Sequence, residues 1–168
     1  MSHSNSSAAA GLTALQPLAG KWHTEGQQHE GPLGPAATFV AVETFEWLEG
    51  GQFLIHRLDG HFGGQAAACV EVLGKREDGQ LIAHSFYSDG KRNDWAIKED
   101  GPTLVWSGVW SKGPEDSLHV RYTVRFEDVG NTLVGKWEQS RDGQTWQVFL
   151  DARGTRAQPL PNASIGGP

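Results

Sequence analysis

The stretch that decides the fold covers residues 43–64 and reads ETFEWLEGGQFLIHRLDGHFGG. Two segments in which polar and apolar residues alternate, 39–48 and 52–59, flank the triplet Glu49, Gly50 and Gly51. Because glycine tolerates positive φ, a glycine pair between two such segments is a strong signal for a β-hairpin. The sequence therefore predicts a β protein assembled from hairpins.

The same pattern continues on both sides of this hairpin. Turns rich in Gly, Pro and Asp separate the alternating segments, and no helical period of ten residues follows the first turn. The further predicted strands cover residues 21–30, 66–76, 80–88, 92–98, 103–111, 117–127, 132–139 and 145–153. Because closure removes exposed strand edges, about ten antiparallel strands in sequence order predict a single up-and-down all-β barrel.

The ends of the chain differ from the barrel segments. Leu12, Leu15 and Leu18 are spaced for a single amphipathic helical turn that caps one barrel end before Trp22 opens the first strand. Residues 1–11 are predicted to be a disordered tail, residues 12–156 the barrel domain, and residues 157–168 a flexible tail rich in Pro and Gly.

Composition narrows the partners and the compartment. The net charge of -6 over 168 residues gives no general attraction to phosphate backbones or anionic lipids, so we expect neither nucleic-acid nor membrane partners. Cys69 is alone and cannot form an internal disulfide, and the first residues lack the features of a signal peptide. These features predict a cytoplasmic location, and they leave a homodimer open.

Several short motifs resemble one family. They are Leu18-Ala-Gly-Lys-Trp22, the Glu-Gly-Gly-Gln-Phe-Leu segment at 49–54, and a final strand from Asp142-Gly-Gln-Thr-Trp146 through Arg153-Gly-Thr-Arg156. In this order they resemble the lipocalin-like, calycin-type proteins, and most of all the DUF1579 group, over residues 12–156. The resemblance implies a barrel of ten or so strands with an internal cavity, one end plugged by the Trp22 ring, and an activity that is largely unassigned.

A more distant resemblance is to the nitrobindins, ten-stranded barrels that bind haem through a histidine near the C-terminus. This likeness implies haem binding as a third function. After His119, however, the sequence has no histidine, and its final strand offers Trp146, Phe149 and Asp151. No residue of this sequence matches the axial ligand, so we predict no cofactor.

The candidate site residues are aromatic side chains and two histidines. Trp106 and Trp110 share a face with Gly108, and Trp137 shares one with Gly135, which leaves room beside each indole ring for an apolar cavity. A barrel of about ten strands also encloses more volume than side chains readily fill. The predicted ligand-binding residues are Trp47, His56, His84, Phe86, Trp95, Trp106, Trp110, Tyr122 and Trp137.

His56 and His84 each lie between apolar neighbours on one strand face, so we expect them to be either satisfied structural groups or hydrogen-bonding anchors for a ligand. His56 and His61 fall on opposite faces of one strand, so no metal site is predicted there. In strand 117–127, Arg121 and Arg125 are expected on the outer face. The alternative, an inverted strand, would turn both arginines into an anion site inside the barrel.

The sequence favours non-covalent binding of a small, largely apolar or amphipathic molecule. The alternative is an enzyme of the cyclase or isomerase type that uses the same cavity, with His or Glu as acid and base. Catalytic residues are not identified, because no nucleophile elbow, phosphate loop, dinucleotide fingerprint or paired-cysteine motif is present.

Overall fold

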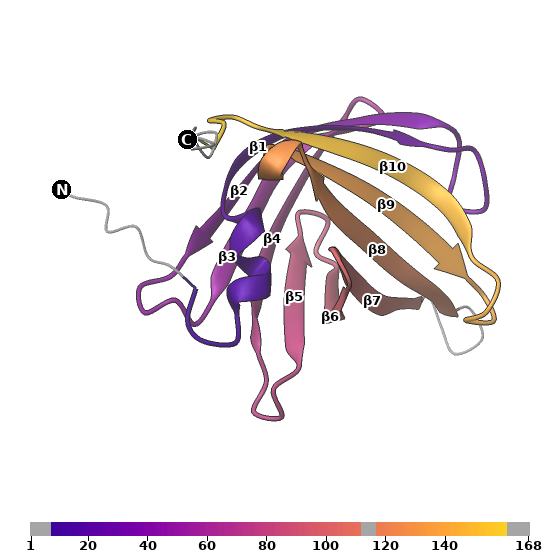
Figure 1. Ribbon diagram of the computed structural model, residues 1–168. Helices are drawn as coiled ribbons and strands as arrows, with labels where there is room; N and C mark the ends of the chain where they lie inside the picture. The colour runs from indigo at the N-terminus through magenta and orange to yellow at the C-terminus, as the bar shows by residue number, and fades with distance from the viewer. Residues whose placement is uncertain (1–7, 112–116, 161–168) are drawn as a thin grey trace, which may run out of the picture.

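A computed structural model describes residues 8–111 and 117–160, and within them ten antiparallel strands form one closed barrel (Figure 1). The strands are β1 (Gly20–Gln28), β2 (Ala37–Trp47), β3 (Leu54–Phe62), β4 (Gln65–Lys75), β5 (Leu81–Tyr87), β6 (Arg92–Asp100), β7 (Thr103–Ser111), β8 (Ser117–Glu127), β9 (Thr132–Ser140) and β10 (Gln147–Arg156). Each strand pairs with its neighbours in sequence, and β1 pairs with β10 to close the ring. The predicted fold is confirmed, with strand boundaries shifted by a few residues.

The predicted hairpin is formed by β2 and β3. Gly50 and Gly51 adopt positive φ angles of 88° and 68°, which accounts for the glycine pair. Two backbone hydrogen bonds lie within the connection. The N–H of Leu48 donates to the carbonyl of Phe53, and the N–H of Gly51 donates to the carbonyl of Leu48, so the loop includes more residues than the glycine pair. In the register of this hairpin, Phe45 faces His56.

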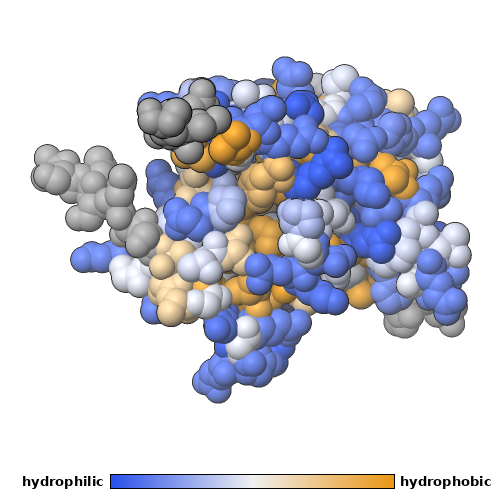
Figure 2. Space-filling model, in the orientation of Figure 1, coloured by the Kyte–Doolittle hydropathy of each residue, from blue (hydrophilic) through white to orange (hydrophobic). Residues whose placement is uncertain are grey.

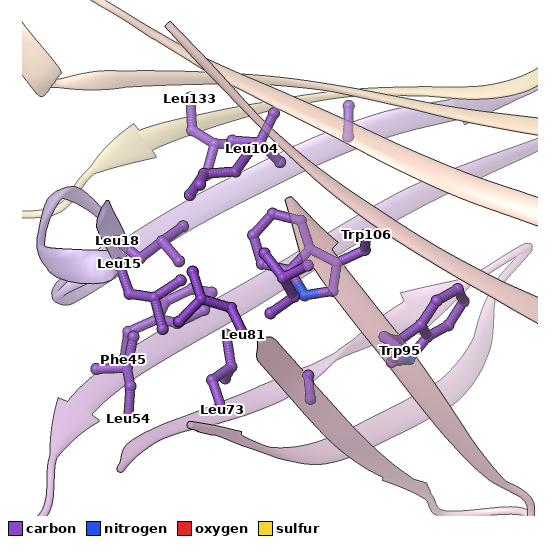
Figure 3. Packing of buried hydrophobic residues seen from close by; sticks show 14 of the residues in the cluster. Leu15, Leu18, Phe45, Leu54, Leu73, Leu81, Trp95, Leu104, Trp106 and Leu133 are labelled. Atoms are coloured by element: carbon purple, nitrogen blue, oxygen red, sulfur yellow. The ribbon is translucent and has the colours of Figure 1, made fainter. Parts of the chain in front are cut away.

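A short 3-10 helix, η1 (Thr13–Leu18), covers one end of the barrel, as the leucine spacing predicted. Leu12, Leu15 and Leu18 are at most 1% exposed, and Nε1 of Trp22 donates a 2.8 Å hydrogen bond to the Leu18 carbonyl. In Figure 3, Leu15 and Leu18 lie against a group of aliphatic side chains from several strands, which includes Leu54, Leu73 and Leu81. Aliphatic packing therefore fills the η1 end of the barrel.

Arg156, the last residue of β10, ties η1 to the barrel. Its guanidinium donates hydrogen bonds to the carbonyls of Ala19 (2.6 Å), Pro17 (2.8 Å) and Gly130 (3.1 Å). The same group lies 4.2 Å from the centre of the Trp22 ring, within the range of a cation–π contact. One side chain thus fixes η1, the first strand and the turn after β8.

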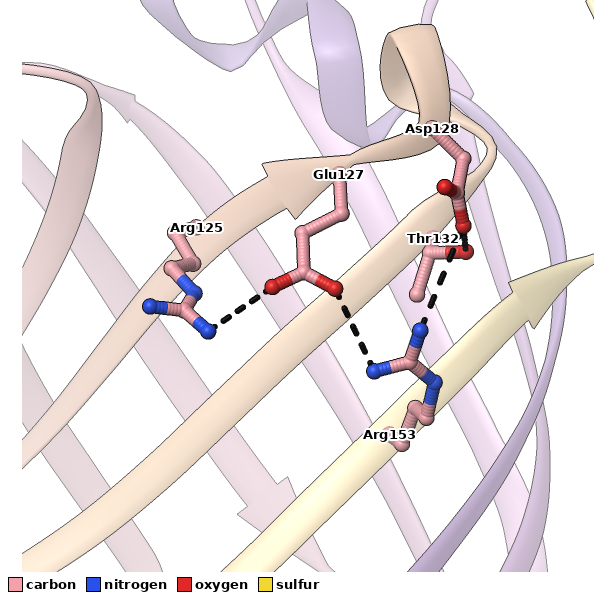
Figure 4. Close-up of polar contacts among 5 residues, drawn as sticks. All are labelled: Arg125, Glu127, Asp128, Thr132 and Arg153. Carbon is pink, nitrogen blue, oxygen red and sulfur yellow. Dashed lines mark hydrogen bonds and ion pairs between the residues drawn. The ribbon is translucent and has the colours of Figure 1, made fainter.

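The arginines of β8 lie outside the barrel, as the preferred interpretation expected. Arg121 donates to Glu138 at 2.7 Å and lies over the Trp146 ring, and Arg125 donates to Glu127 at 2.7 Å. Figure 4 shows how Glu127 and the carboxylate of Asp128, in the short turn η2 (Asp128–Gly130), also contact Arg153 of β10. The alternative of an internal arginine anion site is therefore wrong.

The predicted tails extend partly beyond the described residues. Residues 1–7 and 161–168 lie outside them. Ala8 and Ala9, within the N-terminal tail, pack against the core, and Ala9 N–H donates to the Gly51 carbonyl at 3.0 Å. At the other end, Ala157 N–H donates to Lys21 at 2.8 Å.

The surface in Figure 2 is mainly hydrophilic, with a group of hydrophobic residues at the centre of this face beside η1. None of the helices in the described part of the chain is long and apolar enough to cross a membrane.

Candidate functional site

The barrel contains a pocket of about 420 Å³. It extends from Leu18 at the η1 end to Phe39 and Phe62, which lie together at the opposite end with their rings 6.3 Å apart. Most of the lining side chains are apolar, and the volume is within the range of small-molecule sites. Six of the predicted site residues line it: His56, Trp95, Trp106, Trp110, Tyr122 and Trp137.

Five of these side chains form one side of the pocket, which we call the aromatic wall: Trp95 of β6, Trp106 and Trp110 of β7, Tyr122 of β8 and Trp137 of β9. Tyr122 stacks on Trp137 with ring centres 4.5 Å apart, and the Trp95 ring meets Trp137 edge-on at 5.6 Å. These are favourable aromatic geometries, so the wall is a packed unit.

The glycines beside this wall do not leave empty space, although the alternation of Trp and Gly was predicted to do so. A Cβ at Gly135 would overlap the ring and hydroxyl of Tyr122, and a Cβ at Gly108 would lie 2.7 Å from the Trp95 ring. Rings from adjacent strands therefore occupy the glycine gaps, and the pocket lies in front of the rings.

Three polar side chains on β2, β3 and β4 form a second side, which we call the acidic wall: Glu43, His56 and Glu71. Nε2 of His56 lies 2.8 Å from Oε2 of Glu43, a hydrogen bond. Its Nδ1 lies 3.8 Å from Oε1 of Glu71, the residue opposite it on β4. The imidazole also stacks on Phe45 at 4.0 Å, so its plane is fixed.

A hydrogen-bonded chain connects the two walls. The hydroxyl of Ser85, which is 1% exposed, donates to Oε2 of Glu71 and accepts a 2.9 Å hydrogen bond from Nε1 of Trp95. One oxygen of Glu71 is thus held by Ser85, while the other is directed at His56.

Burial and charge together determine the protonation of His56 and Glu43. Burial favours the neutral imidazole, but the hydrogen bond to Glu43, the polar contact with Glu71 and the charges of both carboxylates outweigh it and raise the pKa of His56 to about 9. Burial also acts to raise the pKa of Glu43, yet the hydrogen bond and charge of His56 lower it below its usual value. At neutral pH the two side chains are therefore an imidazolium and a carboxylate.

The two walls lie on opposite sides of the barrel. In the ring of strands, β2, β3 and β4 lie across from β7, β8 and β9. Burial, followed by the charges of Glu43 and Glu71, raises the pKa of Tyr122, so its hydroxyl stays neutral. Among the described residues that line the pocket, no lysine or arginine is present.

Three predicted site residues do not line the pocket. On β5 the inward positions are the buried Ala83 and Ser85, because small side chains make room for Trp95; His84 therefore points outward and contacts Asp94 at 2.6 Å. Phe86 shares this outer face and is 52% exposed. The inward orientation predicted for His84 and Phe86 is wrong. Trp47 packs against the core at the end of β2 and does not reach the pocket.

Sequence reasoning missed both carboxylates of the acidic wall. Glu43 alternates with Phe45 and Trp47, and Glu71 alternates with Cys69 and Leu73, so each shares the phase of inward residues. The sequence does contain one signal for them, namely a charged residue at a position that the alternation places on the inner face of the strand.

The last strand, β10, offers no axial ligand for haem. Phe149, Leu150 and Ala152 are what β10 presents to the pocket, and none of them can ligate iron. Within the described ranges the one histidine that lines the pocket is His56, whose ring nitrogens face Glu43 and Glu71.

A closed ring of antiparallel strands around an internal pocket defines a calycin-like barrel protein. The chain belongs to the DUF1579 family, described as a protein of unknown function, which matches residues 10–156. No curated protein matches the sequence.

Two of the solved structures that share the barrel fold illustrate the likeness. Rv2717c from M. tuberculosis is 18% identical, with a TM-score of 0.62 over 90% of this chain and 99% of that chain. The S-type phycobiliprotein lyase CPES from Guillardia theta is 11% identical, with a TM-score of 0.57 over 87% and 92% of the two chains.

Proposed function

We propose that this protein binds a small, largely apolar molecule non-covalently inside its barrel. The observation that carries the proposal is the pocket of about 420 Å³, with the aromatic wall on one side and three polar groups on the other. A fold shared with a phycobiliprotein lyase supports the broader idea of ligand binding or handling. The lone Cys69 supports a cytoplasmic location as part of the same proposal.

The expected affinity follows from buried area. Burying roughly 300 Å² of apolar ligand surface gains about 7 kcal/mol at about 25 cal/mol per Å². After the free-energy cost of association, the expected dissociation constant is near the micromolar range. Polar contacts between the ligand and the acidic wall lower this dissociation constant further.

Native mass spectrometry of the purified protein tests the proposal. We expect an additional mass that is lost on denaturation, and we expect it to be absent from an Ala67→Trp variant, because Ala67 lines the pocket and an indole there would fill it. Ala66→Trp, at the adjacent exposed position, is the matched control and should keep the additional mass. An additional mass that Ala67→Trp retains would show that the molecule binds elsewhere.

The second candidate is an enzyme of the cyclase or isomerase type. The observation that favours it is His56 held between two carboxylates at the edge of an apolar pocket, which is an acid–base arrangement. A rate with a bell-shaped pH profile that is lost in His56→Gln and kept in His84→Gln would support it. If the bound molecule is not converted, the enzyme candidate is wrong and the binding proposal stands.

A further inference from the structure

We propose that the ligand of this barrel is a cation, an apolar or aromatic amine whose ammonium group lies between Glu71 and the aromatic wall. This inference rests on the proposed binding function and adds the charge of the ligand to it. It is carried by the distribution of charge and of aromatic rings around the pocket.

The charged groups of the pocket favour a cation. Two carboxylates, Glu43 and Glu71, face a single imidazole, and no lysine or arginine accompanies them among the lining residues that the structure describes. His56 binds Glu43 directly at 2.8 Å, so Glu43 is compensated.

Glu71 is the less compensated carboxylate. Its nearest cationic atom is Nδ1 of His56 at 3.8 Å, which is long for a hydrogen bond, and the neutral Ser85 hydroxyl is its other partner. The Glu71 side chain is only 12% exposed, and an acid buried to this degree gains from a cationic partner. An ammonium donor on the ligand would supply a charge-assisted hydrogen bond to Oε1.

The aromatic wall favours the same charge. Indole and phenol rings present a negative π face, and cations bind over such faces in sites of this kind. Trp106, Tyr122 and Trp137 line the pocket on the strands across from the acidic wall, so a cation beside Glu71 has aromatic rings on its other side and no lysine or arginine among the described lining residues. A carboxylate placed beside Glu71 would be repelled by it, because the two groups carry the same charge.

The positive side chains of the barrel cannot reverse this preference. Arg121 and Arg125 lie outside, where Glu138 and Glu127 bind them. The guanidinium of Arg156 donates its hydrogen bonds to three backbone carbonyls at the η1 end. An anionic ligand therefore finds no arginine fork in the pocket.

The test is a calorimetric titration with three naphthalene compounds of similar size: naphthylmethylamine as the cation, naphthylmethanol as the neutral compound and naphthoate as the anion. Binding of naphthylmethanol reports on the pocket alone. We expect the amine to bind at least about tenfold more tightly than the alcohol, as for one charge-assisted hydrogen bond, and naphthoate to bind most weakly.

The variant Glu71→Gln tests whether Glu71 is the carboxylate that binds the ammonium group. This variant should reduce the advantage of the amine over the alcohol, measured as the ratio of the two affinities. Glu46→Gln, on the exposed face of β2, is the matched control and should keep the order of affinities. Naphthoate or the alcohol binding as tightly as the amine to the wild-type protein overturns the charge inference and leaves the binding function intact. Absence of binding by all three compounds overturns both.

Discussion

The guanidinium of Arg156 lies 4.2 Å from the centre of the Trp22 ring, so the last residue of β10 covers a tryptophan near the start of β1. Trp22 is in turn bonded to Leu18 of η1, and Arg156 holds the carbonyls of Pro17 and Ala19. The end of the barrel beneath η1 is therefore closed by groups from both ends of the chain.

This contact predicts that Arg156→Lys is destabilising although the charge is kept. An ammonium cannot reach three carbonyls in fixed directions or stack on an indole as a guanidinium does. We expect a loss of about 1–3 kcal/mol in the free energy of unfolding, measured by urea denaturation. Arg153→Lys on the exposed outer face of β10 is the control, and equal losses in the two variants would contradict the role of Arg156.

The ion pair of His56 and Glu43 predicts a stability that depends on pH. The pKa of His56 is raised from 6.5 to about 9, so its contribution is complete below pH 6.5 and is lost as the pH rises toward about 9. The difference corresponds to about 3 kcal/mol. The lowered pKa of Glu43 adds a loss at acid pH, once the carboxylate becomes protonated.

Urea denaturation across this range is the measurement. His56→Gln should lack the decline between neutral and alkaline pH, whereas His84→Gln, whose side chain is on the outer face, should keep it. A wild-type slope in His56→Gln would mean that another group titrates.

Gly135 predicts a second destabilising change. Gly135→Ala places a Cβ on the Tyr122 ring and hydroxyl, and this ring is stacked on Trp137 and cannot move away freely. Overpacking of this kind costs about 1–3 kcal/mol. Tryptophan fluorescence should change as well, because the aromatic wall shifts. Gly31→Ala, which meets no atom within 4 Å, should do neither.

Cys69 lines the pocket and predicts slow thiol chemistry. Burial, together with the charge of Glu71, raises the pKa of its thiol from 9.0 to about 12. Because the thiolate is the nucleophile, alkylation by iodoacetamide at mildly alkaline pH should be about a thousandfold slower than in the urea-unfolded chain. Similar rates in the two states, followed by mass spectrometry, would show that the thiol is exposed.

The barrel could be predicted from the sequence because its information is local. Alternation and glycine turns mark each strand, and the hairpin at Gly50 and Gly51 fixes its own direction. The closed end was likewise predicted from Leu12, Leu15 and Leu18. These residues form one apolar stripe on a short helix, and the open end of a barrel is where such a stripe can be buried.

The candidate site was only partly predictable, because which face of a strand points inward depends on its neighbours. On β5 the pattern around His84 looked apolar, yet the inward face is that of Ala83 and Ser85, because the Trp95 ring requires small partners. On β10 the register shifts between Val148 and Leu150, so Phe149 and Leu150 both line the pocket. A change of this kind has no clear mark in a single sequence.

Closure of the ring by β1 and β10 has a consequence for how the pocket comes into existence. Every other seam of the sheet joins strands that follow one another in sequence, so an emerging chain can form hairpins one after another as an open ribbon. The two walls enclose the pocket only when β10 is paired with β1. A ligand that contacts both walls therefore binds the closed barrel and stabilises it over the open ribbon.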